Sequence, residues 1–288
     1  MSIALQSPDV EMAKSPTGPT REEVRKDLRE WMTRTGVDLH QVANETGFAH
    51  RSLIQFVSGS QYGSGSGNDT AAALQAYMSE RPQSLGEEIA NSVSHGVALL
   101  AAIVAVPFLI SSAGHFGPAN VVGASVFAAT MVLLYLSSTL YHALPPGRGK
   151  HVFMKLDHGA IYFFIAGSYT PFALGALGGP WGWTLFGLVW LLACVGATLK
   201  AVDRLSHPWL STGLYLLMGW LVLIAAVPLL ERVPTAGVVL LVAGGVAYTV
   251  GVVFFVLGSR LRYAHAVWHG FVATGTAFHF FAVLGYAP

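Results

Sequence analysis

The chain has 288 residues, of which 53% are hydrophobic and only 11% are charged, and its formal net charge is +1. Soluble domains carry about 25% charged residues, so this composition excludes an ordinary soluble globular protein. The apolar excess lies almost entirely after residue 88, which predicts a polytopic membrane protein with a polar N-terminal piece. The single cysteine, Cys194, excludes an intramolecular disulfide.

The polar N-terminal piece divides into a disordered stretch and a small helical domain. Residues 1–19 lack hydrophobic periodicity and are predicted to be disordered. Residues 20–80 show apolar side chains at helical spacing, which predicts four short helices. Thr20 is expected to cap the first of them, Gly36 to end it, and residues 59–68 to be flexible. Residues 81–86 are predicted to be a linker.

The second and third short helices resemble the helix-turn-helix of repressor-like domains. The small residue, the turn glycine and the core apolar residue of that motif would be Ala43, Gly47 and Leu53. The face that would enter a DNA groove carries His50, Arg51, Ser52 and Gln55. Residues 1–86 hold eight basic and ten acidic side chains, however, and DNA affinity rests largely on phosphate neutralisation. The charge therefore favours a cytoplasmic protein partner over DNA, and both stay open.

Residues 87–288 are predicted to form a bundle of seven transmembrane helices, so the expected fold class is all-α. Each apolar run is close to the roughly 20 residues that a helix needs to cross the hydrocarbon. Pro171 is expected to kink the third helix. The runs fall at residues 91–112, 119–142, 155–176, 182–199, 209–230, 237–258 and 265–286.

Basic residues predict the orientation of the bundle, because they accumulate on the cytoplasmic side. One side carries only Arg232. The other side carries the basic residues of the N-terminal piece together with Arg148, Lys150, Lys155, Lys200, Arg204, Arg260 and Arg262. The N terminus is therefore expected in the cytoplasm and the C terminus outside, with the chain in the inner (plasma) membrane.

Histidines from two predicted spans fall at the same depth. His265 and His269 are four residues apart and project from one helix face, and His142 ends the second span. Asp157 begins the third span at the same end, and Ser138 lies one turn deeper than His142. Ionisable residues inside membrane helices usually mark a site. Three neutral imidazoles suit Zn²⁺ and leave one position for water, with Asp157 and Ser138 as catalytic candidates.

Two further histidines are expected to have other roles. His95 on the first span is predicted to pack beside the site or to support its ligands. His279 lies about 21 Å farther along the last helix than His265, so it is expected to bond a neighbouring helix.

Several spaced motifs resemble the hemolysin III family, the bacterial arm of the adiponectin and progestin receptor superfamily. They are EEIANSVSH at 87–95, STLYH at 138–142, KLDHGAI at 155–161, AGSYTPF at 166–172 and HAVWH at 265–269. The resemblance implies zinc held by His142, His265 and His269. It also implies that Asp157 contacts water and that Ser138 belongs to the site. The N-terminal extension departs from the usual bacterial pattern.

The resemblance implies a zinc-dependent hydrolase of a lipid amide or ester, with membrane lipids as partners and a ceramidase-like reaction. Two alternatives stay open. In the first, the protein is a non-enzymatic sensor or receptor with a structural zinc and a cytoplasmic regulatory domain. In the second, it is a cytolytic protein. A channel is disfavoured because the outer halves of the helices are nearly all apolar. Neither the substrate nor the oligomeric state follows from the sequence.

Overall fold

The computed structural model describes residues 19–35, 37–59, 67–79, 83–202, 204–205 and 208–286. The chain separates into two compact units, Met1–Ser79 and Glu80–Pro288. Every regular element within the described ranges is helical, which confirms the all-α prediction. Residues 1–18, predicted to be disordered, lie outside these ranges, as do Gly36, most of the predicted flexible stretch and residues 81–82 of the predicted linker.

The N-terminal unit contains the helices α1 (Arg21–Thr35), α2 (Leu39–Thr46), α3 (His50–Ser58) and α4 (Gly67–Ser79). Each contributes a side chain with no exposed surface to a common core, namely Leu28, Val42, Leu53 and Leu74. The turn between α2 and α3 contains Gly47 at φ 75°, a left-handed conformation that favours glycine. The apolar spacing of these short helices therefore builds a small core of its own.

Thr20 caps α1, as the sequence predicts, and Glu23 completes a capping box. The Glu23 amide donates to the Thr20 hydroxyl over 3.3 Å, and the Thr20 amide donates to the Glu23 carboxylate over 2.6 Å. The bond from the Thr20 backbone, followed by that from its hydroxyl, lowers the pKa of the Glu23 carboxyl, because hydrogen bonds to the ionised form favour it. These bonds satisfy amide groups that have no partner inside the first turn.

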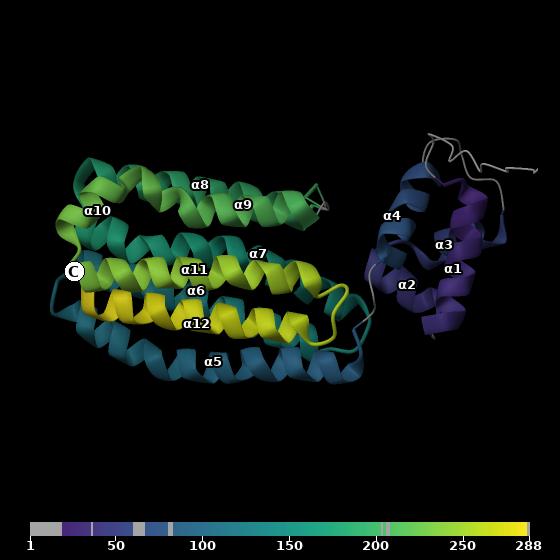
Figure 1. Ribbon diagram of the computed structural model, residues 1–288, viewed down its shortest axis with the longest axis horizontal. Helices are drawn as coiled ribbons and strands as arrows, with labels where there is room; N and C mark the ends of the chain where they lie inside the picture. The colour runs from purple at the N-terminus through teal and green to yellow at the C-terminus, as the bar shows by residue number, and fades with distance from the viewer. Residues whose placement is uncertain are drawn as a thin grey trace, which may run out of the picture. The chain divides into compact units, whose positions relative to one another are not determined.

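Among the described residues, seven helical segments are long and apolar enough to cross a bilayer, which confirms the predicted number (Figure 1). The first three spans are α5 (Leu85–Gly114), α6 (Pro118–Ala143) and α7 (Arg148–Phe172), the last continued by a π-helical segment, η1 (Ala173–Leu177). The fourth is α8 (Gly179–Ala201). The fifth comprises α9 (Pro208–Trp220), the 3₁₀ segment η2 (Leu221–Ala225) and α10 (Ala226–Arg232). The sixth and seventh are α11 (Thr235–Leu257) and α12 (Ala264–Tyr286).

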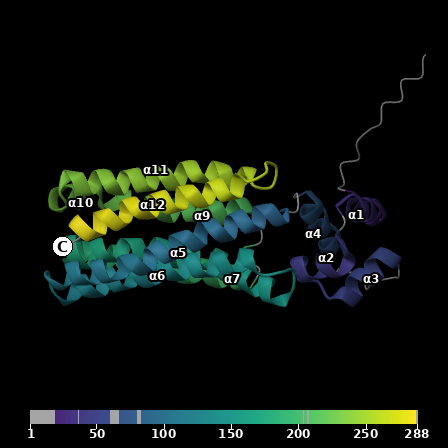
Figure 2. The same ribbon diagram turned by 90° about the horizontal axis from the view of Figure 1, so that it is seen from below.

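The spans pack with their neighbours in the chain, and α12 packs against both α11 and α5. The last helix therefore closes the bundle onto the first, and the two run alongside each other in both views (Figures 1 and 2). The spans α6 and α7 have the largest buried share. Residues near the end of α6 and the start of α12 consequently meet at one end of the bundle.

The fifth span differs from the continuous helix expected at 209–230, because 3₁₀ geometry interrupts it between α9 and α10. The buried Tyr169 hydroxyl lies at this break. It accepts from the Val222 amide over 2.9 Å and lies 2.7 Å from the Met218 carbonyl oxygen, so it satisfies backbone groups that the break frees. In the third span, π-helical backbone begins at Ala173, two residues after Pro171.

Gly123 marks a close approach of α6 to α7. A Cβ atom there would lie 2.8 Å from the Pro171 Cα atom, a backbone contact that no side-chain rotation relieves. We expect Gly123→Ala to destabilise the detergent-solubilised protein by about 1–3 kcal/mol, the usual cost of overpacking. Thermal unfolding would measure this loss. Gly187→Ala is the matched control, because nothing lies within 4 Å of its added Cβ; equal melting temperatures would contradict the expectation.

Candidate metal centre

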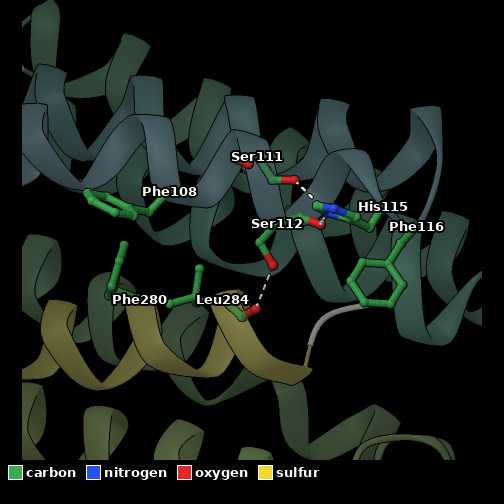
Figure 3. A pocket seen from close by; sticks show the side chains of 7 residues that line it. All are labelled: Phe108, Ser111, Ser112, His115, Phe116, Phe280 and Leu284. Carbon is green, nitrogen blue, oxygen red and sulfur yellow. Dashed lines mark hydrogen bonds between the residues drawn. The ribbon is translucent and has the colours of Figure 1, made fainter.

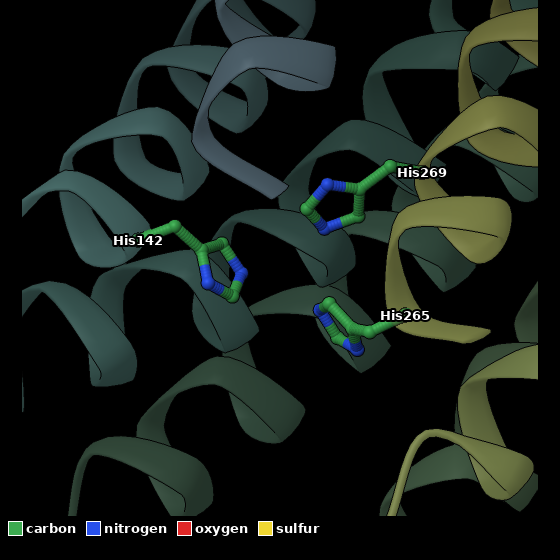
Figure 4. Close-up of side chains that lie close together, drawn as sticks. All are labelled: His142, His265 and His269. Carbon is green, nitrogen blue, oxygen red and sulfur yellow. The ribbon is translucent and has the colours of Figure 1, made fainter. Parts of the chain in front are cut away.

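Three imidazoles from two helices converge at one end of the bundle (Figure 4). His142 comes from α6, while His265 and His269 come from the first turns of α12. One nitrogen atom from each lies within 4.8 Å of the others, and the ring centroids are 4.7 to 5.2 Å apart. His142 and His269 are buried and His265 is partly buried. This cluster has the donor set and the spacing to hold one metal ion.

The chain leading into each helix fixes the position of its histidines. After His142, α6 ends at Ala143, and the next turn contains Pro145 and Pro146, which cannot continue a helix. Before α12, Tyr263 adopts φ 61° and its amide donates to the Glu87 carboxylate over 3.0 Å. This bond ties the start of α12 to α5, so His265 and His269 enter the bundle in a fixed register.

The second nitrogen of His269 is held by α5. Its Nδ1 atom lies 3.1 Å from the Asn91 backbone oxygen and 3.0 Å from the Ser94 hydroxyl. The Ser94 hydroxyl itself donates to the Asn91 oxygen. A carbonyl oxygen only accepts, so His269 carries its proton on Nδ1. The Nε2 lone pair of His269 is therefore available to a metal.

The buried atoms of the cluster fit a metal. His142 Nε2 has no hydrogen-bond partner in the described part of the protein, although a buried polar atom without a partner costs about 1–3 kcal/mol. A cation bound by three imidazoles would satisfy this atom. Because the donors are three nitrogens without a thiolate, they suit zinc, copper, iron or nickel better than calcium or magnesium.

A small cavity lies beside the histidines, bordered by His95, Ser138, Asp157, His265 and His269 among other side chains. Its volume is about 20 Å³, room for roughly one water molecule. The predicted catalytic candidates Asp157 and Ser138 are both buried. The structure thus brings an acid and a hydroxyl, from two helices, to the same space as two of the predicted ligands.

His95 is a more prominent part of the site than its sequence position indicates. Its ring stacks on that of His269, with centroids 3.5 Å apart and planes 10° apart. The side chain is buried, and neither ring nitrogen has a partner among the described residues. Stacking fixes the ring, while its unpartnered nitrogens remain available to a group that enters the cavity.

The sequence does not single out the groups that bond the outer nitrogens of the ligands. Glu88 bonds His142, and Asn91 and Ser94 bond His269. The spacing of Glu88, Asn91 and His95 places them on one face of α5, and this polar stripe in an apolar span was the available signal. His279 lies elsewhere on α12, with Nε2 3.3 Å from the Leu241 oxygen, so the predicted bond to a neighbouring helix is confirmed.

A more spacious groove lies at the opposite ends of α5 and α12 (Figure 3). It has a volume of about 790 Å³ and is lined mainly by aromatic and aliphatic side chains. The Ser112 hydroxyl crosses it to donate to the Leu284 carbonyl over 3.0 Å. His115 is the one imidazole among its lining residues, so this groove lacks the donor set of the histidine cluster despite its size.

Comparison with known proteins shows that the seven-helix part of the chain matches one family. The profile described as "Haemolysin-III related" matches residues 83–280, a range that contains the whole site. "Hemolysin-3 homolog" of Bacillus subtilis (strain 168) is 45% identical over 201 residues, 69% of this chain and 94% of that protein. "Hemolysin-3" of Bacillus cereus is 44% identical over 210 residues, 73% and 95% of the two chains. "Monocyte to macrophage differentiation factor" of Homo sapiens is 29% identical over 229 residues, 74% and 92%.

Removing one imidazole from α12 tests whether the histidine cluster binds a metal or only contributes to packing. We expect His269→Ala to reduce bound metal from about one ion per chain to near zero, because a site with two remaining imidazoles loses a ligand that zinc centres normally require. Elemental analysis of purified protein would measure this. His279→Ala removes another imidazole from the same helix and is expected to keep the metal; equal metal contents in the two variants would contradict the assignment.

Proposed function

The chain belongs to the haemolysin-III-related family of integral membrane proteins, and from that premise we propose that it is a zinc-dependent hydrolase of a lipid amide or ester. One observation carries the proposal: a carboxyl group and a hydroxyl, Asp157 and Ser138, border the same buried cavity as two of the three clustered imidazoles. A purely structural zinc site needs four ligands and no such neighbours. The cluster leaves a position open and surrounds it with groups that move protons.

His142, His265 and His269 would hold the zinc ion. When bound, zinc supplies a Lewis acid that polarises an acyl carbonyl and makes water more acidic. The imidazoles contribute neutral nitrogen donors, and the absence of thiolates from the cluster leaves the ion more electrophilic than a sulfur-ligated one. Burial among apolar helices strengthens every electrostatic interaction inside the site.

Asp157 acts as the general base. Its carboxylate takes a proton from the attacking water and returns that proton to the leaving nitrogen or oxygen. The carbonyl carbon forms a bond to the water oxygen while its bond to the leaving atom breaks, so the products are a fatty acid and an amine or alcohol. Ser138 donates a hydrogen bond to the carbonyl oxygen as negative charge develops there, and it borders the same cavity as Asp157.

One observation favours the second candidate, a sensor or receptor with a structural zinc. The cavity of about 20 Å³ accepts a water molecule but not the acyl group of a lipid. A hydrolase must therefore open by separating the ends of helices that border the cavity, whereas a sensor could use the closed state as one of its two signalling states. Turnover distinguishes these functions, because only the hydrolase consumes lipid.

The proposed chemistry predicts that substitution of Asp157 or of Ser138 reduces lipid hydrolysis. In vesicles of phosphatidylcholine with N-acylsphingosine, we expect Asp157→Asn to reduce fatty-acid release by about 10²–10⁴-fold. Ser138→Ala should reduce it by about 10²-fold. Mass spectrometry of the released acid measures both, and both variants should retain zinc.

Ser137→Ala is the control, because the Ser137 hydroxyl bonds the Leu134 carbonyl within its own helix over 3.1 Å. Stoichiometric zinc without fatty-acid release from either lipid by the unmodified protein would count against the hydrolase and favour the sensor.

We further propose that the N-terminal unit lies in the cytoplasm of a plasma-membrane protein and binds a cytoplasmic protein. Arg260 and Arg262 precede α12, and Arg148 and Lys150 begin α7, so these basic residues flank the end of the bundle that carries the histidines. On α3, His50, Arg51 and Gln55 are exposed and available to a partner. The acidic surplus of residues 1–86 disfavours DNA as that partner.

Single-cysteine variants test this orientation. In a Cys194→Ala background, we expect a membrane-impermeant maleimide to spare Gln55→Cys in intact cells and to label it after permeabilisation, since the positive-inside bias supports a cytoplasmic α3. Thr235→Cys, at the opposite end of the bundle, should be labelled in intact cells. The reverse pattern would overturn both the orientation and the cytoplasmic partner.

A further inference from the structure

Glu88 on α5 joins the histidine cluster to a lysine. One carboxylate oxygen lies 2.7 Å from His142 Nδ1, and the other lies 2.9 Å from Lys150 Nζ. The Glu88 and Lys150 side chains are 21% and 13% exposed, so the pair is largely screened from water. Lys150 also donates to the Tyr141 and Leu144 carbonyls near the end of α6. The carboxylate is therefore held on both sides.

The distances decide which nitrogen of His142 carries the proton. An ionised carboxylate only accepts hydrogen bonds, so the 2.7 Å contact requires a proton on His142 Nδ1. The alternative donor, Asn91 Nδ2, lies 3.5 Å from the same nitrogen and already donates to Gln83 over 2.7 Å. The short, charge-assisted contact is the stronger one. In neutral His142, the lone pair is consequently on Nε2, the atom that has no hydrogen-bond partner among the described residues.

We propose that Glu88 is a positioning residue for the metal centre: its carboxylate fixes the Nδ1–H form of His142 and aims Nε2 at the ion. The inference rests on the proposed metal-dependent function, and it adds a residue that touches neither metal nor substrate. A carboxylate on the outer nitrogen of a histidine makes the inner nitrogen a stronger donor and restricts rotation of the ring.

The helix α5 also bonds the outer nitrogen of His269. The Asn91 carbonyl and the Ser94 hydroxyl, one and two turns after Glu88, hold the Nδ1 atom of His269. The helix α5 therefore sets the tautomer of two ligands that come from α6 and α12, while supplying none of the three clustered imidazoles. Lys150 contributes from α7 by holding the charge of Glu88 in place.

The neighbouring glutamate, Glu87, has a different role. Glu87 accepts from the Ser84 amide over 3.0 Å in the capping box of α5, and from the Tyr263 amide over 3.0 Å at the start of α12. These bonds hold backbone segments rather than an imidazole. The two adjacent carboxylates thus have separate partners. Glu87 bonds backbone amides at helix ends, and Glu88 bonds the His142 imidazole.

The test measures zinc affinity of the full-length protein in detergent, by competition with a chromophoric chelator. We expect Glu88→Ala to weaken binding by about 10–100-fold, the usual effect of losing such a partner. Glu88→Asp, which restores the charge on a shorter side chain, should recover part of the affinity. Glu231→Ala removes an exposed carboxylate from α10, away from the cluster, and should bind zinc within about twofold of the unmodified protein.

Co²⁺ replacing zinc gives a readout that stability alone does not move. The visible absorption bands of the cobalt-loaded protein should change in Glu88→Ala and return toward the original spectrum in Glu88→Asp, because they depend on ligand geometry. An unchanged affinity and spectrum in Glu88→Ala would overturn the positioning role while leaving the metal centre intact. An unmodified protein that binds neither ion would overturn the metal-dependent function itself.

Discussion

The contact between α12 and α5 is the interaction on which the site depends. His142 and the two histidines of α12 are far apart in the sequence, and they meet only because the last helix closes the bundle against the first. Polar bonds fix the register of that contact at both ends. The Tyr263 amide bonds Glu87 beside the cluster, and the Ser112 hydroxyl bonds the Leu284 carbonyl at the other end. Sliding α12 by one turn would break both bonds and remove His269 from the Asn91 carbonyl.

Hydropathy and spacing predict most of this fold because each span satisfies its own backbone. Length and apolar composition therefore locate the seven helices, and the four-residue spacing of His265 and His269 identifies their common face. The break at η2 could not be predicted in this way, since the partner of its freed backbone groups is the Tyr169 hydroxyl from another span. The early start of α5 at Leu85 likewise depends on a capping box that hydropathy does not register.

The sequence likewise identifies some residues of the candidate site and not others. Residue type and depth identify the three clustered histidines and Asp157, because ionisable side chains are rare inside apolar spans. Ser138 follows from its position four residues before His142. Glu88 carries a weaker signal, namely its place with Asn91 and His95 on one face of α5. It stands beside a second glutamate at a helix start, where acidic residues are common for reasons of the helix dipole. Only the three-dimensional arrangement separates the carboxylate that bonds an imidazole from the one that bonds backbone amides.

Some buried polar atoms of the bundle have no hydrogen-bond partner among the described residues. Buried polar atoms in folded proteins nearly always have partners, and at the histidine-bearing end of α5 Glu87, Glu88 and Ser94 are all bonded. The exceptions among the described residues include Asn91 Oδ1 on α5 and His279 Nδ1 farther along α12, but three of them lie together. Both nitrogens of His95 and the Ser138 hydroxyl have no partner among the described residues, and both side chains border the small cavity. Helix packing that satisfies the surrounding groups yet leaves these atoms open is better suited to receiving a ligand than to holding the bundle together.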